Sequence, residues 1–219
     1  MKRKTLQSIM KRLLTGLAKV EYSGTEHLPQ EGGVIVATNH MSRMDTLYLF
    51  INPARTDITA LVADKYKKYP VFNWILDVGQ VIWLDRDKAD FGAFRVAAEW
   101  LKKGVALGIA LEGTRSQTGS LQEGKPGAVL LAQRTGVPIV PVAIAGTENY
   151  FHDLLRLRRP RLRLTFGPAV YVPPLDRDKR DEQLKYWTDE IMARIAALLP
   201  PKYWGFYKDH PRVKELVGN

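Results

Sequence analysis

The sequence predicts an α/β fold in which a mostly parallel, mixed sheet is flanked by helices, with an amphipathic helix at the N-terminus. Short apolar segments that suit buried strands alternate along the chain with longer segments of helical periodicity, an order typical of βαβ units. The first twenty residues carry apolar side chains at helical spacing. A chain of 219 residues with 45% apolar content can also bury one sizeable core.

The predicted N-terminal helix, residues 1–20, contains six basic residues and no acidic one. Its apolar side chains recur every three or four positions, at Leu6, Ile9, Met10, Leu13, Leu14 and Leu17. A basic amphipathic helix of this kind either lies on an anionic membrane or docks on its own domain. We therefore divide the chain into residues 1–20, a candidate membrane anchor, and residues 21–219, the main domain.

The central part of the chain carries the alternating strands and helices. We expect buried strands at residues 33–39, 57–63, 79–84, 105–111 and 137–145. We expect helices at residues 43–51, 64–77, 87–103 and 126–135, with Pro70 breaking the second and Gly104 ending the third.

The C-terminal part of the chain predicts one more strand unit and one long helix. Residues 161–172 form a strand pair or a single bent strand, and residues 176–199 form an amphipathic helix. The apolar face of that helix consists of Leu184, Trp187, Ile191, Ile195 and Leu198. The tail from residue 200 onward is rich in aromatic residues, which predicts that it folds back onto the domain.

Composition excludes several classes of function. The net charge of +10 favours an anionic partner, such as a phosphate-bearing substrate, a membrane surface or nucleic acid. No helix-turn-helix, zinc-finger or RNP motif accompanies the charge, so nucleic acid is not expected as a partner. There is no cysteine and the four histidines are scattered, so we expect no metal and no tightly bound cofactor. No run of about 18 uncharged apolar residues is present, and we expect a cytoplasmic chain.

A histidine and an aspartate five positions apart, His40 and Asp45, follow the first buried strand. Two interpretations are open for this pair. Asp45 could simply favour the start of a helix that Ser42 caps, since carboxylates stabilise helix N-termini. Alternatively, His40 lies in the loop before the helix and folds over its first turn, where Asp45 orients the imidazole as a general base.

Three further polar residues follow strands of the same predicted sheet. Glu112 and Arg115 come directly after residues 105–111, and Arg86 follows residues 79–84. Ligands bind at the carboxyl ends of strands in open α/β sheets, and an arginine fork suits phosphate. Taken singly, Glu112 and Arg115 could also be a surface ion pair, and Arg86 an ordinary surface arginine.

Four segments taken together indicate a function more specifically than any of these residues alone. They are "NHMSRMD", "GQVIWLDR", "LEGTRS" and "VPIVPVAI". In order and spacing, over roughly residues 33–144, they resemble the motifs of the glycerolipid acyltransferase family, typified by 1-acylglycerol-3-phosphate acyltransferase. One departure is Leu111, where family members usually have proline; this bears on the turn before Glu112. A second departure is the single N-terminal helix, where many members have a longer hydrophobic anchor.

The resemblance implies roles for individual residues. His40 would be the catalytic base and Asp45 its partner. The predicted acceptor-binding residues are Arg86, Glu112, Gly113, Thr114, Arg115 and Lys125. Pro138 and Pro141 would shape the strand beside this pocket.

The implied reaction is transfer of a fatty acyl group from a thioester donor, acyl-CoA or acyl carrier protein, to the free hydroxyl of a lysophospholipid. Lysophosphatidate, which would give phosphatidate, is the first choice of acceptor; other lysolipids and amino-acid lipids stay open. A peripheral position on the inner face of the cell membrane would follow. The alternative of a different class is a non-catalytic basic module that binds membrane or nucleic acid, and the arginines within residues 156–163 favour it.

Overall fold

The computed structural model describes residues 1–85 and 90–218. Within them a seven-stranded sheet has the order β1-β7-β6-β2-β5-β3-β4. The strands are β1 (Lys19–Ser23), β2 (Val34–Thr38), β3 (Thr59–Ala63), β4 (Ile82–Leu84), β5 (Ala106–Ala110), β6 (Ile139–Ala145) and β7 (Arg161–Phe166). All neighbouring strands are parallel except β6 and β7, so the predicted mostly parallel, mixed sheet is confirmed.

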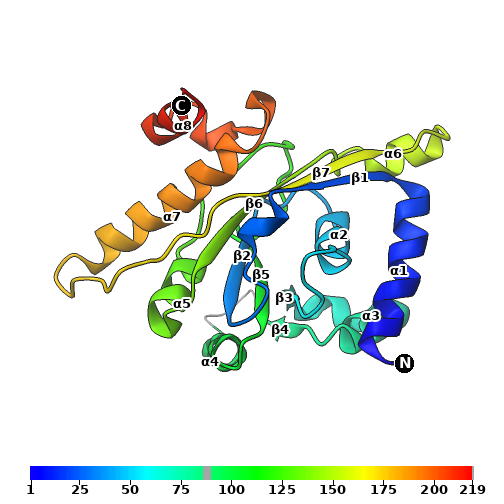
Figure 1. Cartoon of the computed structure of the whole chain (residues 1–219), viewed down its shortest axis with the longest axis horizontal. Helices are drawn as coiled ribbons and strands as arrows, with labels where there is room; N and C mark the ends of the chain where they lie inside the picture. The colour runs from blue at the N-terminus through cyan, green and yellow to red at the C-terminus, as the bar shows by residue number, and fades with distance from the viewer. Residues whose placement is uncertain (86–89, 219) are drawn as a thin grey trace.

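Helices cover both faces of the sheet, as Figure 1 shows. The helices are α1 (Arg3–Leu17), α2 (Met44–Phe50), α3 (Pro70–Val78), α4 (Phe91–Lys102), α5 (Gly127–Thr135), α6 (Tyr150–Leu155), α7 (Arg180–Ala197) and α8 (Pro211–Gly218). Short 3₁₀ turns occupy Thr25–His27, Asp64–Lys68, Pro201–Tyr203 and Gly205–Tyr207. Among the described residues, no helix combines the length and apolar character needed to cross a bilayer.

Strand β2 divides the core into two layers because its side chains alternate. Ile35 and Ala37 pack with α4, α5 and α7 on one face, whereas Val34 and Val36 pack with α1 and α2 on the other. Both faces are apolar, which explains why this strand reads as a continuous apolar run. Because β2, β3, β5 and β6 are parallel, their carboxyl ends lie at one edge of the sheet.

Several predicted boundaries shift in the structure. Pro70 does interrupt the helix predicted for residues 64–77, leaving a 3₁₀ turn followed by α3. The strand predicted for 79–84 is shorter and the helix predicted for 176–199 begins later than expected. In the segment 161–172 the strand β7 ends at Phe166, and Val170 makes only an isolated antiparallel bridge to Ile139, so the strand is shorter than predicted. The tail does fold back, burying Tyr203, Tyr207 and Val213.

Three of the strands and helices given above, β1, α6 and α8, are absent from our predictions. Strand β1 begins at Lys19, inside the segment predicted as the N-terminal helix, because that helix ends at Leu17. Its partner β7 lies more than a hundred residues away in the chain, with Lys19 opposite Arg161. Helix α6 was also not predicted; at six residues it is too short for a reliable periodicity.

Candidate active site

His40 is held in a short loop directly after β2. The side chain of the preceding Asn39 donates to the Ile144 carbonyl at 2.8 Å and accepts from the Ile144 amide at 2.7 Å. This side chain thus continues the pairing of β2 with β6 by one position, as a backbone amide would. Asn39 is buried, and the contact fixes the point at which the chain leaves the sheet and turns to His40.

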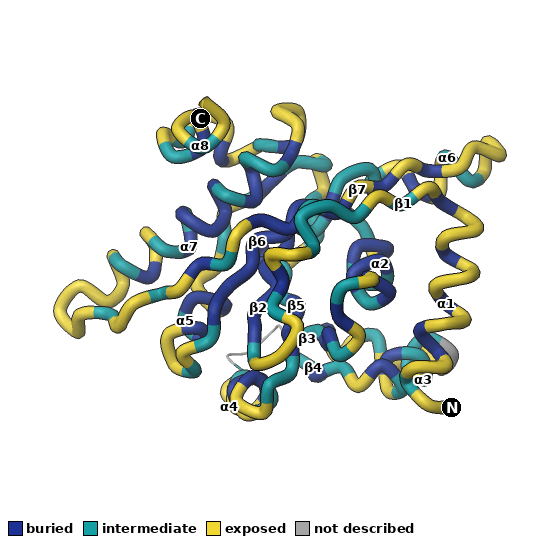
Figure 2. Tube along the Cα trace, viewed as in Figure 1, coloured by how far each residue is buried: buried dark blue, intermediate teal, exposed yellow. Residues whose placement is uncertain are grey.

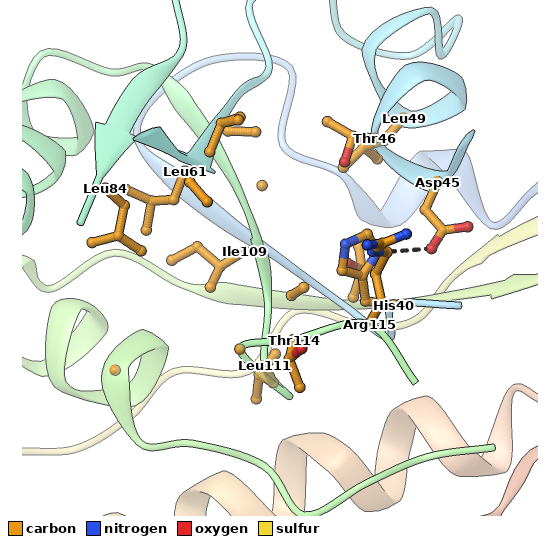
Figure 3. A pocket seen from close by; sticks show the side chains of 18 of the residues that line it. His40, Asp45, Thr46, Leu49, Leu61, Leu84, Ile109, Leu111, Thr114 and Arg115 are labelled. Carbon is orange, nitrogen blue, oxygen red and sulfur yellow. Dashed lines mark hydrogen bonds and ion pairs between the residues drawn. The ribbon is translucent and has the colours of Figure 1, made fainter. Parts of the chain in front are cut away.

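Asp45 lies in the first turn of α2 and contacts the His40 ring (Figure 3). The His40 Nδ1 and the Asp45 Oδ2 are 2.9 Å apart, and the imidazole is only 13% exposed. A carboxylate only accepts hydrogen bonds, so Nδ1 carries the proton and Nε2 is left as the basic nitrogen.

The same carboxylate oxygen also organises the loop. It accepts hydrogen bonds from the amides of Met41 at 2.7 Å and Ser42 at 2.8 Å. The helix begins at Met44 and Ser42 supplies only a long 3.3 Å contact to it, so the prediction that Ser42 is the N-cap is wrong. Asp45 therefore holds the backbone of the loop and contacts the His40 ring with the same carboxylate oxygen.

A threonine from a third element completes the shell around Asp45. Thr147, just beyond β6, is buried and its hydroxyl donates to the Asp45 Oδ1 at 2.5 Å. Neither Thr147 nor Asn39 was assigned a role from the sequence. The position of Thr147 after a buried strand was the available signal, because strand ends converge at this edge of the sheet.

Glu112 lies behind the His40 loop. Its side chain is buried and accepts from the His40 amide at 2.8 Å and from the Gln122 amide at 3.1 Å. Both oxygens thus face backbone amides, and Glu112 is not among the residues that line the pocket described below. These contacts hold the backbone at His40 in place, and the acceptor-binding role of Glu112 stays a prediction.

Burial raises the pKa of the Glu112 carboxyl to about 7, although its two amide hydrogen bonds act in the opposite direction; the negative charge of Asp45 adds a smaller increase. The folded protein therefore retains a proton that the unfolded chain loses near pH 4.5. It follows that the contribution of Glu112 to the free energy of unfolding is greatest below about pH 4.5 and decreases as the pH rises to about 7.

We expect Glu112→Gln to weaken this pH dependence because glutamine has no charge to bury. Denaturant unfolding of both proteins at pH 5 and pH 8 measures it. The wild type should lose more stability between the two pH values than the variant does. An equal loss in both proteins would contradict a raised pKa at this position.

A pocket of about 350 Å³ opens in front of His40, at the carboxyl ends of the strands. One end of it is apolar and is lined by Leu49, Leu61, Leu76, Leu84, Ile109 and Leu131. The other end carries His40, Thr114 and Arg115 (Figure 3). Lys125 also lines the pocket and lies against Gly113. The pocket thus combines an apolar part with a basic part that also contains the imidazole.

The loop after β5 places the predicted basic residues in this pocket. The Ser116 amide donates to the His40 carbonyl at 2.7 Å, so the loop carrying Arg115 lies against the His40 loop. Lys125 lies across Gly113, where a Cβ atom would come within 2.9 Å of the lysine side chain. Within the described part of the chain, neither Arg115 nor Lys125 has a carboxylate partner.

The remaining predicted residues lie beside this pocket or beyond the described structure. Arg86 falls within residues 86–89, outside the described residues. Pro138 directly precedes β6 and Pro141 lies within it, and both are next to β2. The structure explains why a leucine is accommodated at position 111. The Leu111 amide donates a hydrogen bond to the Thr38 carbonyl at 3.0 Å, and a proline has no amide hydrogen to donate.

The arrangement suits proton abstraction beside a bound anion. An imidazole whose second nitrogen is held by a carboxylate can accept a proton from a hydroxyl and stabilise the resulting charge. The guanidinium of Arg115 beside it suits a phosphate, and the apolar end suits a hydrocarbon chain.

Comparison with known proteins agrees with this chemistry. Residues 19–145 match the profile of a family described as Acyltransferase. The 1-acyl-sn-glycerol-3-phosphate acyltransferase of Borreliella burgdorferi is 31% identical over 183 residues, covering 82% of this chain and 73% of that protein. The enzyme of the same name from Pseudomonas aeruginosa is 26% identical and covers 85% and 74% of the two chains.

A solved structure is similar along most of the chain. The crystal structure of the 1-acyl-sn-glycerophosphate acyltransferase from Thermotoga maritima superposes with a TM-score of 0.67 at 28% identity, covering 86% of this chain and 76% of that one. The family profile spans more than half of the sequence, and its residues include both His40 and Arg115. The chain therefore belongs to the glycerolipid acyltransferase family, and it is an acyltransferase enzyme.

Proposed function

We propose that this enzyme transfers a fatty acyl group from a thioester donor to the free hydroxyl of 1-acylglycerol-3-phosphate, giving phosphatidate for phospholipid biosynthesis. The observation that carries the proposal is the 2.9 Å contact between His40 and Asp45 at the wall of a pocket with one apolar and one basic end. The relatives named above are acyltransferases for this acceptor, which supports the choice.

The proposed mechanism is direct transfer between the two substrates. The Nε2 of His40 takes the proton of the acceptor hydroxyl while the oxygen attacks the thioester carbonyl. A C–O bond forms, the C–S bond of the tetrahedral intermediate breaks, and the imidazolium returns the proton to the departing thiolate. Asp45 stabilises the charged imidazolium meanwhile. The chain contains no cysteine, so no acyl-thioester on the enzyme forms in this scheme.

The acceptor phosphate is assigned to the basic end of the pocket. Arg115 supplies a planar fork for two phosphate oxygens, and Lys125 adds a second positive charge beside Gly113. Thr114 offers a hydroxyl from the same loop. The apolar end is assigned to an acyl chain.

The direct test is thiol release by the purified enzyme. Acyl-CoA and acyl carrier protein are each supplied as donor, with lysophosphatidate, a phosphate-free lysolipid, an amino-acid lipid or no acceptor. We expect release that depends on lysophosphatidate, with phosphatidate as the product, and the comparison of donors identifies the carrier. Release with an amino-acid lipid but not with lysophosphatidate would overturn the acceptor assignment.

The proposed acceptor is a lipid, so the enzyme has to reach a membrane. We therefore assign residues 1–20 as a membrane anchor and residues 21–219 as the catalytic domain, and we place the enzyme peripherally on the inner face of the cell membrane. Helix α1 carries apolar side chains on its buried side and on its exposed side. Leu6, Met10 and Leu14 are buried against the domain, whereas Ile9, Leu13 and Leu17 form an exposed outer stripe. Arg3 is tied to carbonyls of the domain, and the other five basic residues of the segment are exposed.

The inner side of α1 also connects to the pocket. Met10 lines a small cavity of about 30 Å³ together with Thr46, Leu47 and Leu49, and these three also line the main pocket. The apolar end of the pocket therefore approaches the helix that we place on the membrane. This supports entry of the acyl chain from the α1 side.

Leu13→Glu is expected to weaken binding to anionic vesicles several-fold, because it puts a carboxylate in the exposed stripe. Co-sedimentation with phosphatidylglycerol vesicles at low salt measures the effect. The matched control is Tyr186→Glu on α7, where an exposed aromatic side chain lies away from α1. Equal loss in both variants, or no vesicle binding by the wild type, would contradict the anchor.

A further inference from the structure

A second cluster of exposed apolar side chains occupies the end of α6 and the turn that follows it, and we call residues 151–158 the α6 tip. Phe151 is 59% exposed, Leu155 is 86% exposed and Leu157 is 97% exposed. Single exposed leucines are ordinary on protein surfaces, but three large apolar side chains within seven residues form a patch. Figure 2 shows this segment projecting at the edge of the molecule.

The backbone of the α6 tip holds its leucines outward. Leu157 has a φ of 55°, a left-handed conformation that is common for glycine and disfavoured for leucine. The turn is held by hydrogen bonds from the Leu157 amide to the Leu154 carbonyl and from the Arg158 amide to the Asp153 carbonyl, both 2.9 Å. Leucine thus occupies a position where a glycine would relieve strain, and its side chain contacts almost nothing of the domain.

The charges around the α6 tip favour an anionic partner. Arginines 156, 158, 159, 161 and 163 lie within or directly after it. Arg163 pairs with Glu21 at 3.2 Å, but within the described part of the chain Arg156 and Arg158 have no carboxylate partner. Asp153 is the acidic residue of the tip, and it contacts His152 at 4.0 Å. Apolar side chains beside the exposed Arg156 and Arg158 suit an anionic bilayer, into which leucines insert while guanidinium groups remain among the headgroups.

The residue that follows the α6 tip, Arg159, connects this segment to α1. Arg159 donates to the Thr15 carbonyl at 2.8 Å and to the Ala18 carbonyl at 3.3 Å, at the end of α1. The strands that continue from the two elements, β1 and β7, pair directly. Figure 1 shows α6 and the end of α1 at the same corner of the molecule, so the tip lies close to the C-terminal end of α1.

We propose that the α6 tip inserts Phe151, Leu155 and Leu157 into an anionic membrane as a second point of attachment beside α1. A single surface helix can roll about its axis, whereas two linked contacts fix the orientation of the domain on the bilayer. The inference rests on the proposed function in one respect, that the acceptor of the enzyme lies in a bilayer.

Site-specific labelling tests the insertion directly, because the chain contains no cysteine. Leu157→Cys carries an environment-sensitive NBD label in the full-length protein, and Val217→Cys on α8 is the matched control, since Val217 is also exposed. With phosphatidylglycerol vesicles we expect the emission at position 157 to rise and shift to the blue, with no change at 217 and little change with phosphatidylcholine alone. An unchanged signal at 157 while the protein co-sediments with the vesicles would overturn the proposal.

Partitioning measurements provide the second test. The double variant Leu155→Glu, Leu157→Glu is expected to bind the same vesicles about tenfold more weakly, because two apolar insertions are lost. Its thiol release with a short-chain lysophosphatidate in solution should equal that of the wild type, since neither leucine lines the pocket. Unaltered partitioning would overturn the proposal. An enzyme that acylates no lysolipid yet shows the response at 157 would contradict the proposed function and leave the insertion supported.

Discussion

Replacement of His40 by alanine is expected to lower kcat for acyl transfer by about 10²–10⁴-fold, the usual contribution of a general base. The loss should appear with either donor and with little change in the KM of the acceptor, because the imidazole acts on the reacting hydroxyl and the basic end of the pocket is untouched. Thiol release under saturating substrates measures it.

The fold should survive this substitution. Asp45 still accepts hydrogen bonds from the amides of Met41 and Ser42 and from Thr147 when the imidazole is removed. Thermal unfolding followed by circular dichroism checks this point. His210→Ala, in the C-terminal tail, is the matched control and should keep wild-type turnover. A His40→Ala enzyme that retains most of its turnover would refute the mechanism.

Asp45→Asn is a less specific test of the same pair. It should also lose much of the rate, since the orientation of the imidazole depends on the carboxylate. An asparagine nitrogen at this position, however, would face amide donors of the loop, and the loop itself would change. For this reason the alanine variant of His40 separates chemistry from folding more cleanly.

Arg115→Ala is expected to raise the KM of lysophosphatidate about ten- to a hundredfold, with a smaller effect on the KM of the donor. A hydrogen bond to a charged group contributes about 1.5–3 kcal/mol, and each 1.4 kcal/mol is a factor of ten. In the described part of the chain no carboxylate neutralises this guanidinium, so its charge is available to a ligand. Steady-state kinetics with the concentrations of the two substrates varied independently measures both constants.

Two comparisons keep the Arg115 test specific. Arg177→Ala, an exposed arginine in the loop before α7, should leave both KM values unchanged. A phosphate-free lysolipid should be a poor acceptor for the wild type and should be little affected by Arg115→Ala. If the wild type acylates phosphate-free lysolipids as well as lysophosphatidate, the assignment of a phosphate to Arg115 fails.

The sequence by itself determined the fold class and the approximate position of most elements. Apolar runs such as Val34–Thr38 have to be buried on both faces, and periodic segments such as α4 have to cover them, so the alternation of the two predicts an α/β sheet. The resemblance of four motifs, in order and spacing, to the glycerolipid acyltransferase family singled out His40, Asp45 and Arg115 as a set. The fold class depends on local spacing and side-chain character, and the choice of site residues depends on that resemblance.

Tertiary structure decided which residues complete the site. Thr147 bonds to Asp45 from 102 residues away, Asn39 bonds to Ile144 from 105 residues away, and Glu112 supports the His40 amide across 72 residues. The order of strands in the sheet likewise places β1 beside β7 and divides the apolar residues of α1 between the core and the surface. Periodicity identifies an apolar stripe but not which part of it is buried, because burial depends on segments distant in the chain that pack against it.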